Sequence, residues 1–209
     1  MTKTQTLQNI KILTPNLISA SLPSFKNSKL TAKADMSING TTLAPAIKGT
    51  ISIPTINIPD FMFIGKNITV NLTKDVINAK SPEIDLNGSK ISFDTDISTN
   101  FGENTIINNL IINSNDMDVD KLFTIMEAMP QTNVAPAASV PVIIKKGHGT
   151  LSKVKSGTLV ATNASGDFTL KNNIFDLKNL KATAYNGIVA GNVSYNIPYE
   201  TTKAKIQAL

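Results

Sequence analysis

The chain has 209 residues, of which 20 are basic and 15 acidic, so its net charge is +5. Charged residues make up only 17% and apolar residues 41%, a balance that excludes an intrinsically disordered chain. Cysteine is absent, which excludes disulfides and thiolate metal sites. Every basic residue is lysine, scattered among few aromatics, and this pattern argues against a nucleic-acid partner. No apolar run approaches the ~18 residues of a membrane-spanning helix.

Strict alternation of apolar and polar residues dominates the chain and predicts half-buried strands. The clearest runs are ITVNL (68–72), KISFDTDIS (90–98), GDFTL (166–170), FDLKNLKATAY (175–185) and NVSYNI (192–197). Between such runs lie short turn signals, which predict hairpins. These are Asn39-Gly40, Asn87-Gly88, Ser156-Gly157, Ser165-Gly166, Asn172-Asn173 and Asn186-Gly187. We therefore expect about eleven to fourteen strands in an antiparallel sheet.

Two stretches depart from this pattern. Apolar residues at helical spacing predict one short helix near 117–129, with Asp116 or Asp118 as its N-cap. The next residues, 131–141, are rich in Pro, Ala and Ser and predict a linker or loop. The expected organisation is thus a β-sheet segment over 1–130 that ends in the helix, the linker, and a C-terminal β unit over 142–209 that continues the same sheet. The N-terminus has no signal-peptide pattern, and we expect an internal segment of a longer protein.

No catalytic constellation is present, and we expect neither an enzyme nor a cofactor. His148 is the single histidine, flanked by two glycines, and is interpreted as an exposed turn residue. Asp116, Asp118, Asp120 and Glu127 have the spacing of a calcium loop, but Lys121 stands where that loop needs glycine. These acids are therefore interpreted as the start of the helix, and no metal site is expected. A glycosidase would need paired carboxylates, and nothing marks a pair among Asp85, Asp94, Asp96 and Asp167.

The apolar faces of the strands are the strongest functional signal. A dozen strands with one Ile/Val/Leu/Phe face must bury it by folding into a sandwich or barrel, or leave it as a hydrophobic groove. From the residues alone a closed sandwich is favoured, and the groove stays open as the alternative.

The stretch 34–53 resembles a recurrent unit of AsmA-like and TamB-like bacterial envelope proteins. The matching residues run through a turn between two alternating strands: Gly40, Leu43, Pro45, Ile47, Gly49, Ile51 and Ile53. Residues 105–130 resemble the strand-then-helix passage of that family, and residues 166–197 resemble its C-terminal unit, with Asn186-Gly187 in place of the usual Gly-Gly.

This resemblance implies an elongated, curved sheet with an apolar groove, in the periplasm, as part of an inner-membrane-anchored protein. It implies non-enzymatic binding or conduction of phospholipid acyl chains between inner and outer membranes, or support of outer-membrane assembly. Envelope proteins are further candidate partners, and membrane contact would come through parts of the parent protein outside this chain. The candidate groove lining, chosen by alternation, is Ile51, Ile53, Ile68, Val70, Leu72, Ile84, Leu86, Ile91, Phe93, Ile97, Phe168, Leu170, Phe175 and Leu177.

The competing hypothesis is a structural or scaffolding β-sandwich with a closed core that binds protein partners by edge-strand addition. An open groove of this size would, in addition, favour a homodimer with groove facing groove.

Overall fold

The computed structural model describes residues 6–14, 18–20, 27–41, 44–99, 104–128, 141–196 and 201–208. In the first half the strands are β1 (Thr6–Leu13), β2 (Ile18–Ala20), β3 (Lys29–Thr41), β4 (Ala44–Ile58), β5 (Phe63–Leu72), β6 (Val76–Leu86) and β7 (Ser89–Ser98). The second half has β8 (Thr105–Asp118), β9 (Val142–Ser156), β10 (Leu159–Lys171), β11 (Ile174–Ala184), β12 (Gly187–Asn196) and β13 (Thr201–Ala208). The helices are the 3₁₀ turn η1 (Pro59–Phe61) and α1 (Val119–Ala128).

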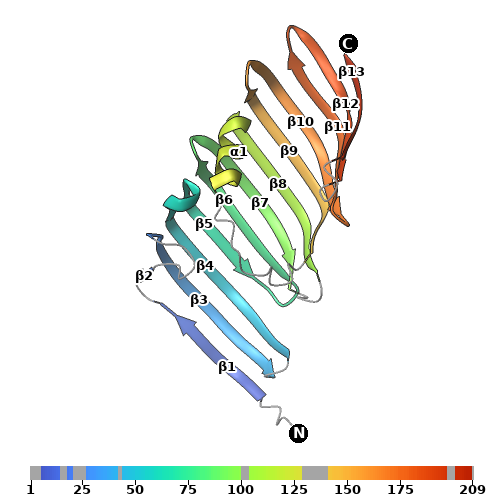
Figure 1. Ribbon diagram of the computed structural model, residues 1–209. Helices are drawn as coiled ribbons and strands as arrows, with labels where there is room; N and C mark the ends of the chain where they lie inside the picture. Colours follow the sequence, from blue (N-terminus) through green and yellow to red (C-terminus); the bar gives the residue numbers. More distant parts are fainter. Residues whose placement is uncertain are drawn as a thin grey trace.

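All thirteen of these strands belong to one sheet, which follows the chain almost in order (Figure 1). The path runs β1-β3-β4-β5-β6-β7-β8-β9-β10-β11-β12-β13, and β2 pairs with β3 beside it. The mostly β fold with one short helix that the sequence predicts is confirmed.

The pair β8 and β9 is parallel, whereas every other pair is antiparallel. The sequence predicts antiparallel pairing throughout, and this prediction is wrong for β8 and β9. A parallel neighbour needs a crossover of about a dozen residues or more, and α1 begins the segment that joins these two strands. The predicted linker at 131–141 falls within that segment, and all of it except Pro141 lies outside the described residues. Since β8 and β9 are neighbours, the sheet continues across the predicted boundary.

The sheet forms a single layer that does not close on itself. Figure 1 shows the strands side by side in one twisted row, with α1 at one end of β8. The chain exposes 14070 Å², whereas a compact monomer of this mass exposes about 9,400 Å². Among the described residues, the buried apolar side chains are those of Ile84 and Ala164, and each is still 8% exposed. The closed sandwich favoured from the residues alone is therefore not formed by the described part of the chain.

The strands present one apolar face, and its residues lie opposite one another from strand to strand. Examples are the pairs Ile53 with Ile68, Ile84 with Ile91 and Phe168 with Leu177. Small hydroxyl residues on this face are buried and bond to the backbone. The Ser81 hydroxyl donates to the Lys66 carbonyl at 2.9 Å, and that of Ser114 donates to the Lys90 carbonyl at 2.7 Å.

Bulges interrupt the alternation on several strands, at places where the register shifts. Shifts occur between Ser81 and Ile84 on β6, between Thr162 and Ser165 on β10, and between Leu177 and Leu180 on β11. Asn67, Asn163 and Asn179 have a positive φ at such places, a conformation that asparagine tolerates. Bulges bend strands and increase their twist, so this row of bulges curves the sheet.

Most of the predicted hairpins are present, but several turn signals lie away from the turn itself. Asn87-Gly88, Gly157 and Asn172-Asn173 have positive φ in turns between consecutive strands. The β11–β12 turn lies one residue earlier than predicted, at Tyr185-Asn186. Ser165-Gly166 is wrong as a turn because it lies inside β10, where Gly166 gives room to Leu177 on the next strand. Asn39-Gly40 lies within β3, and the following residues 42–43 are outside the described residues.

A matched pair of glycines on β9 tests this packing. We expect Gly147→Ala to destabilise the fold by about 1–3 kcal/mol, because a methyl group there overlaps the Phe168 ring. Gly149→Ala should change the free energy of unfolding by less than about 0.5 kcal/mol, since no atom lies within 4 Å of that position. Neither glycine has a positive φ, so backbone strain does not differ between the variants. Urea denaturation measures both, and equal losses would contradict the packing argument.

Candidate functional site: an exposed apolar sheet face

The fourteen predicted lining residues all lie on the same face of the sheet, which we call the apolar face. Cross-strand pairs link those on β4 to those on β5 (Ile51 with Val70), and those on β10 to those on β11 (Leu170 with Phe175). Strands β6 to β8 carry the face across the middle, where Phe93 is paired with Ile112. Ile84 is 8% exposed, and the other thirteen predicted residues are half-buried. Their neighbours shield their flanks, while their outer surfaces remain accessible.

The register also adds residues to this face that alternation had not selected. Met36 and Ile38 extend it over β3, Ile77 lies beside Ile97, and Leu110 faces Gly147. Val189 and Val193 extend it over β12. Met36, Ile38 and Val193 lie in alternating stretches of the sequence, and the register shows that they share this face.

Charged side chains gather on the opposite face, which we call the polar face. Lys66 Nζ lies 2.8 Å from a Glu83 carboxylate oxygen, and this pairing lowers the pKa of Glu83. Farther along, Lys153 lies 3.6 Å from Asp116 and Lys155 lies 3.7 Å from Asp118. Exposed pairs of this kind stabilise little, but they keep this face in water. The sheet is thus amphipathic across its thickness, with charge on one side.

A hollow interrupts the apolar face between β8 and β11, with a volume of about 220 Å³. Gly149 and Gly166 face each other across β9 and β10 and form its floor. Ile112 stands on one side, and Phe168 and Leu177 stand on the other. The Phe168 ring packs against that of Phe175 with centroids 5.7 Å apart. Sequence analysis interpreted these glycines as turn or flanking residues and missed the hollow.

His148 lies inside β9, so its interpretation as a turn residue is wrong, although its side chain is exposed as expected. On the polar face, its Nδ1 lies 2.8 Å from Asp167 Oδ1, the residue opposite it on β10. The Asn179 amide donates to the other Asp167 oxygen at 2.9 Å, and Thr150 Oγ1 lies 3.4 Å from His148 Nε2. These hydrogen bonds lower the pKa of Asp167. The bond from the Asn179 amide is the larger cause, and the bond to His148 adds to it.

This cluster has the order of a hydroxyl, imidazole and carboxylate relay, but its setting differs from an active site. The side chains of His148 and Asp167 are 45% and 53% exposed on an open strand face. Catalytic relays operate where water is excluded and oxyanion donors are fixed. We interpret the cluster as a cross-strand polar contact that holds the β10–β11 bulge.

The acidic residues at the start of α1 are occupied by protein contacts. Asp118 accepts from the Lys121 backbone N–H at 3.3 Å and thus caps the helix, as the sequence predicts. Asp120 accepts from the Gly157 N–H at 2.6 Å and so ties α1 to the β9–β10 turn. Within the described ranges no cluster of three or more His, Asp or Glu side chains is arranged to hold a metal ion.

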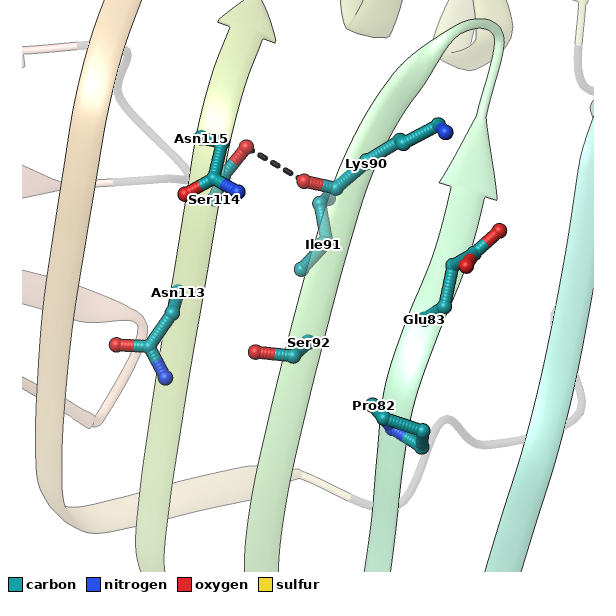
Figure 2. Close-up of a pocket in the computed structure, with 8 residues that line it drawn as sticks. All are labelled: Pro82, Glu83, Lys90, Ile91, Ser92, Asn113, Ser114 and Asn115. Atoms are coloured by element: carbon teal, nitrogen blue, oxygen red, sulfur yellow. Dashed lines mark hydrogen bonds between the residues drawn. The ribbon is translucent and has the colours of Figure 1, made fainter.

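A second hollow of about 190 Å³ lies over β6 to β8 and is polar in character (Figure 2). Ser92 and Asn113 lie side by side there on neighbouring strands, and Pro82 marks the bulge of β6. The Ser114 hydroxyl is bonded to the Lys90 carbonyl (Figure 2). The residues around this hollow are engaged in strand packing, and they bring no catalytic set together.

Comparisons with protein-family models, with curated proteins and with solved structures find no match. The resemblance to AsmA-like and TamB-like proteins therefore stays a prediction from sequence motifs. In the described part of the chain, no helix has the length and apolar character needed to cross a bilayer.

The Asp167 contacts predict a pH response. Because Asn179 and His148 hold the pKa of Asp167 below its ordinary value, their stabilisation is present at neutral pH and is lost as pH falls through that lowered pKa. Asn179→Gly keeps the positive φ and removes the amide, so the pKa of Asp167 should rise toward its ordinary value. Carboxyl NMR titration measures this shift. Asn163→Gly, at another positive φ, is the matched control and should leave Asp167 unchanged.

Proposed function

We propose that this chain is a non-enzymatic segment that binds the acyl chains of phospholipids along its apolar face. The observation that carries the proposal is a single-layer sheet whose apolar face has no covering layer among the described residues. A face of this extent is rare on a protein that works alone in water, and exposed apolar area of this size typically marks a binding surface.

The chemistry of the face suits hydrocarbon. The predicted lining consists of Ile, Val, Leu and Phe, and the buried hydroxyls among them donate to backbone carbonyls rather than into solvent. Each methylene moved from water onto such a surface gains roughly 0.8 kcal/mol. The charges lie on the polar face, so a chain on the apolar face meets no fixed polar partner and is free to move along it.

The setting we propose is the periplasm, within an inner-membrane-anchored AsmA-like protein. What supports this is the motif resemblance together with an open sheet that follows the chain order. Twelve strands in one row extend over roughly 50 Å at the usual strand spacing. Such a surface would carry lipid between inner and outer membranes, or support outer-membrane assembly with envelope proteins as partners.

A second copy of the chain is the competing occupant of the apolar face. Two such faces in contact would bury far more than the roughly 1,200–2,000 Å² of a standard interface. Scaffolding by edge-strand addition is the other alternative, with β1 and β13 at the two ends of the strand order. Both alternatives are distinguished from the lipid proposal by what copurifies with the chain.

Native mass spectrometry of the purified chain, with extraction and identification of lipid, tests the proposal. We expect copurified phospholipid. Val70→Asp places a charge on the apolar face and should lower the bound lipid about tenfold, because a carboxylate there is costly to cover with hydrocarbon. Thr69→Asp, on the neighbouring residue, points to the polar face opposite Lys80 and should retain the lipid.

Circular dichroism establishes that both variants keep the sheet. A lipid-free monomer would overturn the proposal, and a lipid-free dimer would assign the apolar face to the second copy. Equal lipid retention in the two variants would place the lipid elsewhere on the chain.

A further inference from the structure

The apolar face is uneven at one place, the hollow over Gly149. The space above the other two glycines of this region is filled. The Phe168 ring occupies the position that a side chain on Gly147 would take, and Leu177 Cδ1 lies 2.8 Å from the position of a Cβ on Gly166. No atom lies within 4 Å of the corresponding position on Gly149. The gap is therefore specific to this glycine.

The walls of the hollow are fixed by packing. Gly149 is paired with Ile112 on β8 and with Gly166 on β10, so the gap crosses β9 and β10 between taller side chains. Phe168 is held against Phe175, and Ala164 on the floor is 8% exposed. A side chain wedged between neighbours does not swing to fill the gap. The hollow therefore persists as a depression in an otherwise raised surface.

The lining selects the chemistry of the occupant. Nine of its ten residues are Ile, Met, Leu, Phe, Ala or Gly, and the tenth is Ser165. No lining side chain carries a charge to balance a headgroup. Its volume of about 220 Å³ is below the ~300 Å³ at which pockets for whole small molecules begin. The hollow thus accommodates a slender uncharged part of a larger ligand whose remainder lies on the surrounding face.

We propose that the Gly149 hollow is a seat for one acyl-chain end, where a lipid on the apolar face is held rather than sliding. This inference rests on the proposed function, which supplies the hydrocarbon. It adds that the face has a preferred position between β8 and β11. A chain end placed there gains contacts on its sides and below it, whereas elsewhere on the face it is contacted from below.

Photolabelling with a hexadecanoic acid that carries a diazirine at its methyl end tests the seat on the intact chain. In the native protein, label should concentrate on the residues of the hollow, with Leu151 and Phe168 as the diagnostic sites found by peptide mass spectrometry. Gly149→Leu fills the gap and should lower label at these sites about tenfold, as expected when two or three methylenes lose their contacts. Label on β4 to β7 should remain.

Ala79→Leu is the matched control, because it adds a larger apolar group to the same face on β6, opposite Val70. It should leave the label at Leu151 and Phe168 unchanged. Gly149→Ala fills less of the gap and should lower the label at these sites by an intermediate amount. This variant tests the seat if Gly149→Leu fails to fold.

The outcomes separate this inference from the proposed function. Absence of label from the whole apolar face would overturn both. Label spread evenly along the face and unaffected by Gly149→Leu would overturn the seat alone. A third outcome is label on the face outside the hollow together with a dimer in the native mass spectrum. This result would indicate that a side chain of the second copy fills the hollow, and it would also overturn the seat.

Discussion

The structure depends on one constraint: a single-layer sheet cannot bury both of its faces. In most domains a second layer covers the apolar side, and burial there supplies the main stabilisation. Here the described residues contain no second sheet, and Ile84 and Ala164 are their only buried apolar side chains, each 8% exposed. Stability must come from backbone ladders between long strands and from contacts between neighbours on each face. Whatever covers the apolar face adds to that stability by mass action, so binding and folding are linked.

The amphipathic character survives along strands of up to fifteen residues because the bulges are compensated. A bulge inverts the side-chain alternation, and an uncompensated one would turn half of a strand's apolar residues to the polar face. Ile68 follows Gly65 on β5 by three positions, which strict alternation would place on opposite faces. The bulge between them compensates, because the side chains of Ile68 and of Ile56 on β4 both lie beside Gly65. The buried hydroxyl of Ser81 accepts the Glu83 N–H at 3.3 Å and donates to the Lys66 carbonyl, which satisfies backbone groups that the β6 bulge displaces. The bulges thus curve the sheet while one side stays apolar.

Alternation predicted the strands and placed all fourteen candidate residues on one face, because period two is a local property that each strand carries in its own sequence. The errors arise at residues whose role is a contact with a neighbouring strand, which the local sequence does not reveal. Gly166 was predicted to be a turn residue but makes room for Leu177, and His148 was also predicted to lie in a turn but pairs with Asp167 on β10. The parallel pairing of β8 and β9 could not be predicted, since it depends on the path of the connection after α1. Local alternation also could not predict whether the apolar face is covered, because coverage depends on the arrangement of the whole sheet.

The difference between a uniform face and an uneven one bears on what the surface can do. On a uniform apolar strip, every position of a hydrocarbon chain has nearly the same free energy, and transfer along it meets no trap. The glycine pair between β9 and β10 breaks that uniformity, and Gly149 leaves the gap open while Phe168 and Leu177 close the space over its neighbours. A surface that only needed to be apolar would be expected to fill this gap, because close-packed interiors leave few such voids. Under the proposed function, a position that retains a ligand briefly requires such a local departure, and the gap over Gly149 is the place on the face that offers one.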